Sequence, residues 1–336
     1  MKKIRAGIIG LGVGERHING YMSHPDCEVV ALCDFNEDVL QQCKNRYPGL
    51  LTYKNADNLL NKPDIDVVSI ASYDNYHGDQ VAQALLKNKH VFVEKPLCLF
   101  ESEAEKIRLI LNENVNLNLS SNLPLRTVPM FKWLKKKIAE GAFGNVFYIE
   151  ADYLWGRIYK LINGWRGELP FYSIVYGASI HMIDLICWLM PFDKIIEVQG
   201  YGNQMVTQNT DFNFNDFSVL LFKFSSGLIA KVSANSGCAH PHFHKVAIYG
   251  TKATFFNDIN GGTLVRQDGD ITTQETINEE YPGTQKSDIL NSFVDSIIDP
   301  DKKPIVTSKE VFSTMEICFA AEKAIQSNTA VQVNYS

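Results

Sequence analysis

The chain has 336 residues, which exceeds one ordinary hydrophobic core and is sufficient for two domains. Hydrophobic residues make up 45% and charged residues 21% of the chain, a balance that excludes a disordered or fibrous protein. With 32 basic and 38 acidic residues the net charge is -6. This balance gives no reason to expect a nucleic-acid partner, because binding phosphates requires a basic surface.

The seven cysteines are scattered, odd in number and form no Cys-x-x-Cys pair, which is typical of a reducing compartment. The apolar run near the N-terminus is short and stops at glycines, so it does not predict a signal peptide. The most apolar later stretch, 174–190, contains His181 and Asp184 and does not predict a membrane span. We therefore expect a cytoplasmic protein.

The first 120 or so residues alternate short β-branched runs with amphipathic helical patterns. Strands are expected over 4–9, 29–33, 66–71 and 90–93, and helices from the glycine loop to about 23 and over 37–47, 76–87 and 101–112. Such alternation predicts parallel strands joined by right-handed crossovers. Residues 1–121 are therefore expected to form an α/β Rossmann domain with a doubly wound parallel sheet.

After about residue 122 the pattern changes to serial strands with short connections. Helices are expected over 129–140, 178–190 and 309–326, and strands over 145–153, 195–201, 217–224, 228–234, 245–249, 254–257 and 262–266. Serial strands of this kind predict a large, mostly antiparallel sheet. Residues 122–336 are expected to form a C-terminal α+β domain around it, with the last helix packing back on the Rossmann domain.

A glycine-rich loop follows the first expected strand and opens a helix. It reads Gly10-Leu11-Gly12-Val13-Gly14. Such a loop brings backbone N–H groups and the positive end of the helix dipole to a pyrophosphate. The third glycine comes one residue earlier than in G-x-G-x-x-G, where Glu15 stands instead, so the loop is shortened.

A carboxylate supports the same reading. Asp34 ends the second strand, 20 residues after Gly14, with Phe35 next to it. A carboxylate at this place accepts a hydrogen bond from the adenosine ribose and repels a 2′-phosphate. The loop and Asp34 together predict NAD as cofactor in preference to NADP. The alternative is a plain glycine turn with Asp34 capping the next helix.

The chain resembles the glucose–fructose oxidoreductase, inositol dehydrogenase and MocA family. Beyond the glycine loop, the similarity includes Ala71-Ser72 with Asn75 and His77, Glu94-Lys95-Pro96, Arg126-x-x-Pro129, the run at 140–146, Trp165-Arg166 and His181-x-x-Asp184. These motifs cover nearly the whole chain in order. The resemblance implies an open C-terminal sheet used for dimer or tetramer contacts, so we expect a homo-oligomer.

The resemblance also implies a set of nucleotide contacts beyond the loop and Asp34. These are Ala71, Ser72, Asn75, His77, Glu94, Lys95 and Arg126. They follow the carboxyl ends of the expected strands or begin the elements after them. Open α/β sheets bind their ligands at this edge.

Two side chains are the main candidates for proton transfer. Lys95 follows a parallel strand, and a desolvated lysine there can hold or accept the proton of a substrate hydroxyl. His181 interrupts an apolar helix, and Asp184 lies three residues on, hence on the same helical face. An imidazole oriented by a carboxylate is a competent acid/base near neutral pH. The alternatives are a surface lysine and a satisfied core histidine.

The sequence departs from the family pattern just before His181. Sugar- and polyol-oxidising members that it resembles have an aspartate four residues before this histidine, where this chain has Gly177, and Ser179 stands where a glycine is usual. Proton removal is then expected from Lys95, His181 or a nearby tyrosine. Tyr172 and Tyr176 are available, and we expect Tyr176 to be the better placed.

The remaining candidate contacts suit a sugar-like substrate, since aromatic faces pack against sugar C–H groups and arginine binds anionic groups. They are Arg126, Tyr153, Trp155, Trp165, Arg166, Asp184 and His244. His240, His242 and His244 alternate, so in a strand they share one face. No acidic or cysteine partner accompanies them, so no metal site is expected.

The leading hypothesis is reversible oxidation of a secondary hydroxyl on a sugar, sugar acid, polyol or nucleotide-linked sugar. One alternative is a glycosidase that uses tightly held NAD transiently. Another is a dinucleotide- or sugar-binding protein without catalysis, compatible with Gly177 at the aspartate position.

Overall fold

The computed structural model describes residues 3–283 and 286–335. The chain divides into two compact units, which are described separately below. Unit 1 comprises residues 1–123 and 285–312, and unit 2 comprises residues 124–284 and 313–336. Within the described part of the chain, no helix is long and apolar enough to cross a membrane.

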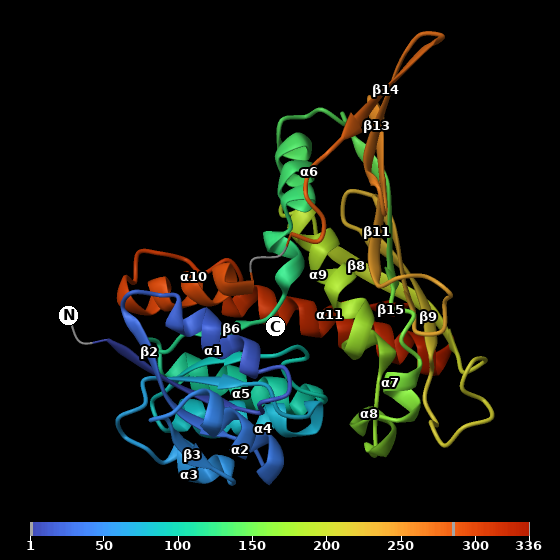
Figure 1. The fold of residues 1–336 in the computed structure, drawn as a ribbon. Helices are drawn as coiled ribbons and strands as arrows, with labels where there is room; N and C mark the ends of the chain where they lie inside the picture. Colours follow the sequence, from blue (N-terminus) through green and yellow to red (C-terminus); the bar gives the residue numbers. More distant parts are fainter. Residues whose placement is uncertain (1–2, 284–285, 336) are drawn as a thin grey trace. The chain divides into compact units, whose positions relative to one another are not determined.

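Unit 1 contains a six-stranded, wholly parallel sheet in the order β3-β2-β1-β4-β5-β6. Its strands are β1 (Ile4–Ile9), β2 (Cys27–Cys33), β3 (Leu51–Tyr53), β4 (Val67–Ile70), β5 (His90–Val93) and β6 (Leu119–Ser121). Its helices are α1 (Glu15–Met22), α2 (Glu37–Arg46), α3 (Ala56–Leu60), α4 (Asp74–Leu86), α5 (Glu101–Glu113) and α10 (Lys286–Ile298). The expected doubly wound Rossmann sheet is confirmed (Figure 1).

The core of unit 1 is completed by a segment from far along the chain. α10 packs beside α1, and its Leu290 and Phe293 are buried with Ile8 and Ile18 in one apolar cluster. The approach is so close that a Cβ on Gly20 would lie 2.4 Å from Leu290 Cδ1. Residues 286–312 thus belong to unit 1 in space although they follow most of unit 2 in sequence.

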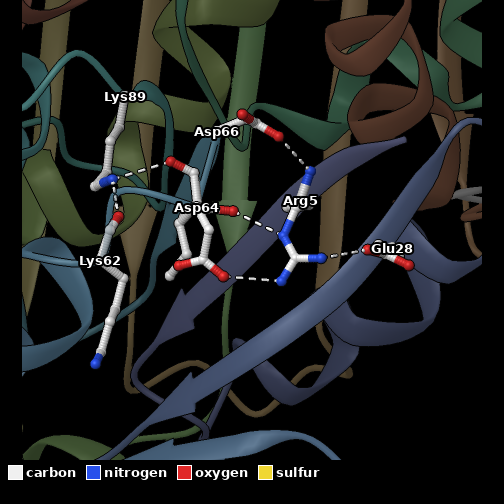
Figure 2. Close-up of polar contacts among 7 residues, drawn as sticks. Arg5, Glu28, Lys62, Asp64, Asp66 and Lys89 are labelled. Carbon is white, nitrogen blue, oxygen red and sulfur yellow. Dashed lines mark hydrogen bonds and ion pairs between the residues drawn. The ribbon is translucent and has the colours of Figure 1, made fainter. Parts of the chain in front are cut away.

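Charged side chains hold the amino-terminal edge of the parallel sheet. The Arg5 guanidinium in β1 donates to Glu28 Oε1 (2.9 Å) in β2 and to Asp64 Oδ2 (2.9 Å) before β4. The Arg5 backbone N–H donates to Asp66 Oδ2 (2.9 Å). Figure 2 shows these contacts converging on Arg5 from three sides. They connect three neighbouring strands at the edge opposite the glycine loop.

A buried lysine strengthens the same edge. Lys89 precedes β5, is 2% exposed, and donates from Nζ to the carbonyls of Lys62 (2.6 Å) and Ile65 (2.9 Å) (Figure 2). Burial lowers the pKa of Lys89, and the nearby Asp64 and Asp66 oppose that effect. These contacts at the amino-terminal edge stabilise the sheet, and the opposite edge is the one at which open α/β sheets bind ligands.

Unit 2 is built on a nine-stranded sheet in the order β14-β13-β12-β11-β7-β10-β9-β8-β15. Its strands are β7 (Val146–Leu154), β8 (Ile195–Asn203), β9 (Phe217–Phe224), β10 (Ile229–Asn235), β11 (Phe243–Gly250), β12 (Ala253–Asp258), β13 (Gly261–Asp268), β14 (Ile271–Ile277) and β15 (Val331–Gln332). Every neighbouring pair is antiparallel except β7 and β10. The expected mostly antiparallel sheet is confirmed.

The helical segments of unit 2 come before β7, between β7 and β8, and after β14. They are the 3₁₀ turn η1 (Pro124–Thr127), α6 (Pro129–Ala139), α7 (Tyr159–Ile162), α8 (Trp165–Glu168), the π-helix η2 (Val175–Ser179) and α9 (Ile180–Leu189). α11 (Ser308–Ser327) begins in unit 1 and belongs to unit 2 from residue 313.

Candidate active site

The glycine loop is seated against the end of β4. Gly10 has φ +85°, and a Cβ there would lie 2.3 Å from the Ala71 carbonyl oxygen. A Cβ on Gly14 would lie 2.1 Å from the Gly10 carbonyl oxygen. Only glycine fits these two positions, because any side chain would push the loop away from β4.

The middle glycine faces a different environment. A Cβ on Gly12 would meet nothing within 4 Å. The N-cap of α1, Gly14, has no side chain to bond the first N–H groups of the helix. Open space, exposed N–H groups and the positive end of the helix dipole are what a pyrophosphate requires. The residues present therefore fit a dinucleotide. The open space beside Gly12, which a Cβ would fill, is the cradle for the pyrophosphate.

Asp34 is fixed in place at the carboxyl end of β2. Its Oδ2 accepts a hydrogen bond from the Leu11 N–H (2.7 Å) and its Oδ1 from the Asn36 N–H (2.8 Å). The side chain is 8% exposed. Each carboxylate oxygen has a further lone pair, so the group can still accept a hydrogen bond from a ribose hydroxyl. Beside it, Phe35 is exposed, with its ring edge against Tyr73 at 5.4 Å.

Asn75, in the first turn of α4, carries a second sign of a missing ligand. Its Oδ1 is buried and has no hydrogen-bond partner among residues 3–283 and 286–335. A buried acceptor without a partner is costly, and native structures usually satisfy it. A donor on a bound nucleotide would satisfy Asn75 Oδ1, and contact between Asn75 and the nucleotide stays a prediction.

His77 is buried between two loops of unit 1. It is fully buried, and its ring nitrogens lie 2.6 Å from the Pro96 carbonyl oxygen and 3.0 Å from the Ser72 carbonyl oxygen. The ring thereby links the loop after β4 to the loop after β5. The Ser72 hydroxyl donates to Gln80 Oε1 (2.7 Å) within α4. The expectation of direct nucleotide contact by His77 stays a prediction.

Glu94 belongs to a buried polar network that the sequence did not reveal. Its Oε1 lies 3.1 Å from His17 Nε2 and accepts a hydrogen bond from Asn122 Nδ2 (2.6 Å). The other ring nitrogen of His17 lies 2.8 Å from Ser69 Oγ. The network therefore joins α1 to the carboxyl ends of β4, β5 and β6, directly before Lys95. The available signal was a histidine one turn into the helix after the glycine loop.

The charge of this network is concentrated on Glu94. Burial acts to raise the pKa of Glu94, but the hydrogen bonds from His17 and Asn122 and the positive charges of His17 and Lys95 outweigh it and lower the pKa to about 2. Glu94 is therefore a carboxylate throughout the physiological range. Glu94 therefore places a fixed negative charge next to Lys95.

In unit 2, rings gather around Tyr153. The Tyr153 ring stacks on His181 (centroids 5.6 Å apart, 14° between planes) and meets His242 and His244 edge-on at 5.1 and 4.9 Å. Tyr153 lies in β7, His181 in α9 and His244 in β11, and His242 lies directly before β11. The structure thus brings together Tyr153, His181 and His244, three residues expected at the substrate.

A second aromatic group consists of Trp155, two residues after Tyr153 in the chain, and Trp165, with Arg166 beside both rings. The Arg166 guanidinium lies 4.3 Å from the Trp165 ring centroid and 5.7 Å from that of Trp155. Burial raises the pKa of Tyr153 to about 12, although Arg157 and Arg166 act to lower it. Tyr153 is therefore a neutral phenol at physiological pH, and the arginine supplies positive charge nearby.

Arg126 and Asp184 are placed against each other. Arg126 Nε and Nη2 donate to Asp184 Oδ2 (3.1 Å) and Oδ1 (2.6 Å), and both side chains are almost fully buried. We expected Asp184 to orient His181, and the two hydrogen bonds instead direct its carboxylate to the guanidinium. The pair joins η1 to α9. Direct contact of either residue with nucleotide or substrate stays a prediction.

The space beside Gly177 is occupied by Tyr172, and a part for Tyr176 in proton removal stays a prediction. A Cβ on Gly177 would lie 2.3 Å from the Tyr172 hydroxyl, so that hydroxyl occupies the space of a side chain at 177. The Tyr176 ring packs edge-on against Phe171 (6.1 Å) and Phe319 (5.8 Å). Gly177 lies in the π-helix η2, one turn before His181, and such wide turns are frequent at functional sites.

The three alternating histidines do not lie in one strand. β11 begins at Phe243, so His240 and His242 precede it and only His244 lies within it. His240 Nδ1 bonds the Pro241 carbonyl oxygen (2.7 Å). Throughout the described residues, no group of three or more His, Cys, Asp or Glu side chains is arranged to hold a metal ion.

Two family models match the chain. One, described as an oxidoreductase family with an NAD-binding Rossmann fold, matches residues 4–120, and the other, described as the GFO/IDH/MocA C-terminal domain, matches residues 131–256. A curated relative, myo-inositol 2-dehydrogenase of Thermotoga maritima, is 23% identical, with 98% of each chain covered.

Solved structures share the fold. Scyllo-inositol dehydrogenase from Lactobacillus casei, determined with bound NAD(H) and scyllo-inositol, is 21% identical with a TM-score of 0.81, covering 99% of each chain. A putative NADPH-dependent oxidoreductase from Desulfitobacterium hafniense is 20% identical with a TM-score of 0.85, covering 99% of this chain and 98% of the other.

Proposed function

Because the chain belongs to the GFO/IDH/MocA oxidoreductase family, we propose that it is an NAD-dependent dehydrogenase acting on a secondary hydroxyl, or the matching ketone, of a polyol or sugar. The observation that supports this most strongly is the cradle at Gly12 next to the anchored carboxylate of Asp34. The ring of hydroxyls on an inositol or sugar suits the aromatic and imidazole groups around Tyr153.

NAD is proposed in preference to NADP. Both oxygens of Asp34 are held by backbone N–H groups, so the carboxylate cannot swing away from a nucleotide that carries a 2′-phosphate. The two negative charges would repel each other in a buried place. Asp34→Ser should therefore narrow the preference for NAD over NADP, and an unchanged ratio of the two dissociation constants would contradict this assignment.

The nicotinamide ring, when bound, supplies the acceptor for the hydride that leaves the substrate carbon. The hydroxyl proton on the same carbon must go to a side chain of the protein. We assign that proton to Lys95, which accepts it as a neutral amine, and the ammonium that forms is stabilised by the negative charge of Glu94. His181 and the Tyr172 hydroxyl at the Gly177 position are proposed to hold the substrate hydroxyls in place.

The experiment measures NAD binding by calorimetry and then NADH formation with a panel of inositols, sugars and sugar acids. Lys95→Ala should abolish NADH formation while NAD still binds. Lys44→Ala is the matched control, because Lys44 is an exposed lysine of unit 1, on α2. Absence of NAD binding to the wild-type protein would refute the proposal.

Two other results would redirect it. Release of free sugar from a glycoside without net NADH would favour a glycosidase that uses NAD transiently. NAD binding with no turnover across the panel would favour a binding protein without catalysis.

We also propose that the protein is a homodimer or homotetramer through the sheet of unit 2. Tyr201, Leu221 and Ile229 are exposed on one face of neighbouring strands, as their pairing register places them on the same side. Exposed apolar side chains gathered on one face favour association with another copy. Light scattering of the purified protein tests this, and a monomer at micromolar concentration would contradict it.

A further inference from the structure

His244 is bonded twice to one phenol. Its backbone N–H donates to the Tyr281 hydroxyl oxygen (2.8 Å), and its Nδ1 lies 2.6 Å from the same oxygen. The two residues are far apart in sequence, since Tyr281 follows β14 and His244 is the second residue of β11. No sequence motif marks Tyr281.

The two hydrogen bonds between His244 and Tyr281 favour one placement of the protons. The Tyr281 oxygen already accepts the backbone N–H of His244, and among the described residues His244 Nδ1 is the one acceptor within reach of the phenolic proton. Tyr281 therefore donates to Nδ1. A neutral imidazole that accepts at Nδ1 carries its own proton at Nε2. In the described part of the chain, His244 Nε2 has no hydrogen-bond partner.

The surroundings keep both groups neutral. The titratable groups whose rings face His244 are Tyr281, His242, Tyr153 and His181. Burial, with a smaller contribution from the charge of His242, lowers the pKa of His244 to about 3. Burial also raises the pKa of the Tyr281 phenol, although its hydrogen bond from the His244 backbone opposes this.

The backbone under His244 is also held. The Asn257 side chain in β12 donates to the His244 carbonyl oxygen (3.0 Å) and accepts from the Val246 N–H (2.6 Å). Asn257 is 2% exposed. The imidazole therefore sits on a rigid strand, and its second nitrogen has a defined direction within the ring cluster of Tyr153 and His181.

We propose that Tyr281 is a positioning residue that locks His244 as the neutral Nε2–H tautomer, so that His244 recognises a hydroxyl or carbonyl oxygen of the substrate as a hydrogen-bond donor. His244 then takes no part in moving the proton. The recognition part of this inference rests on the proposed function, and the tautomer part does not.

The first experiment is ¹⁵N NMR of the histidine side chains in the full-length protein, with His244→Gln used to assign the signals. The expected result is an Nε2–H tautomer for His244 that does not titrate between about pH 5 and pH 8, the window in which an ordinary imidazole changes charge. In Tyr281→Phe the same signal should show both neutral tautomers and should still not titrate in this window, because burial lowers the pKa of His244. Tyr249→Phe, which alters a phenol stacked on Tyr148 instead, should leave it unchanged.

An Nδ1–H tautomer in the wild-type protein, or an imidazolium at neutral pH, would overturn the tautomer assignment. This readout requires neither NAD nor turnover, so it separates failure of this inference from failure of the proposed dehydrogenase activity.

The second experiment tests recognition by titrating myo-inositol into the NAD-saturated protein. The expected result is a shift of the His244 Nε2–H signal. His244→Ala should weaken inositol binding about tenfold, the effect of one lost hydrogen bond. His244→Gln, whose amide N–H can reach the place of Nε2, should restore part of it. If inositol binds but neither moves the signal nor distinguishes these variants, the recognition role is wrong.

Discussion

The glycines at 10 and 12 are both needed, for opposite reasons. At Gly10 the backbone is left-handed and the space for a Cβ is filled by the Ala71 carbonyl, whereas at Gly12 that space is open. The first glycine therefore serves the fold, and the second serves the ligand. In this loop, the tight turn and the open space for the ligand thus depend on two different glycines.

Substitutions at these two positions should have different effects. Gly12→Ala should unfold at the wild-type temperature but bind NAD at least about tenfold more weakly, since the methyl group fills the cradle. Gly10→Ala should lose about 1–3 kcal/mol of unfolding free energy from backbone strain alone. Thermal unfolding and NAD calorimetry on both variants check this. Normal NAD binding by Gly12→Ala would show that the cradle is elsewhere.

Glu94 makes stability depend on acidity. Its pKa is lowered from an ordinary value of 4.5 to about 2, so its hydrogen bonds with His17 and Asn122 stabilise the fold above about pH 4.5. That contribution should decline as the pH falls from 4.5 towards 2, because the unfolded chain takes up the proton first.

Urea unfolding between these two pH values tests the effect. Glu94→Gln should be less stable than wild type near neutral pH, and its stability should change less on acidification. Glu113→Gln, at an exposed carboxylate on α5, serves as the control. Parallel declines for wild type and Glu94→Gln would place the acid sensitivity elsewhere.

At the scale of elements, the pair Arg126–Asp184 attaches η1 to α9, the helix that carries His181. Asp184→Asn should cost about 3–5 kcal/mol of unfolding free energy, because it removes the charge of a carboxylate that is paired with a buried guanidinium. The double variant Arg126→Met with Asp184→Leu should recover much of that loss, since no charge then stays buried. Chemical denaturation of the three proteins measures this, and equal losses in single and double variants would argue against a buried ion pair.

The elements that the sequence predicted most directly are continuous apolar runs. β4, β5 and α9 are of this kind, and so the parallel sheet and the helix with His181 were both anticipated. β14 was missed because its residues Ile271–Thr276 are exposed and mostly polar, so no alternation marks them. β3 and β6 have three residues each, too few for any period to appear.

The position of a site residue could be predicted where it depends only on the strand or loop that contains the residue. Asp34 and the glycine loop are such cases, because the strand–turn–helix geometry is local. The contacts of Tyr281 and His17 depend on pairings across many residues, and no local spacing reveals them. Asp184 had a plausible local partner in His181, but a distant arginine binds its carboxylate.

At the scale of the molecule, unit 1 depends on a helix that arrives after residue 285. Phe293→Ala should cost about 3–5 kcal/mol by leaving a cavity between α10 and the sheet. Hydrogen exchange should then accelerate in β1, β2 and α1, which lie more than 250 residues earlier in the chain. Phe255→Ala, in the buried part of β12, should instead accelerate exchange in the strands of unit 2. Exchange that increases equally in both units would mean that the cores are not separate.

The same interrupted arrangement bears on synthesis at the ribosome. When residues 1–123 have emerged, the apolar surface that later receives Leu290 and Phe293 is still uncovered, and it stays so while some 160 further residues are translated. During that interval the nascent nucleotide-binding fold exposes an apolar surface to which chaperones can bind. A mature, protease-resistant Rossmann fold should therefore appear only when translation is nearly complete.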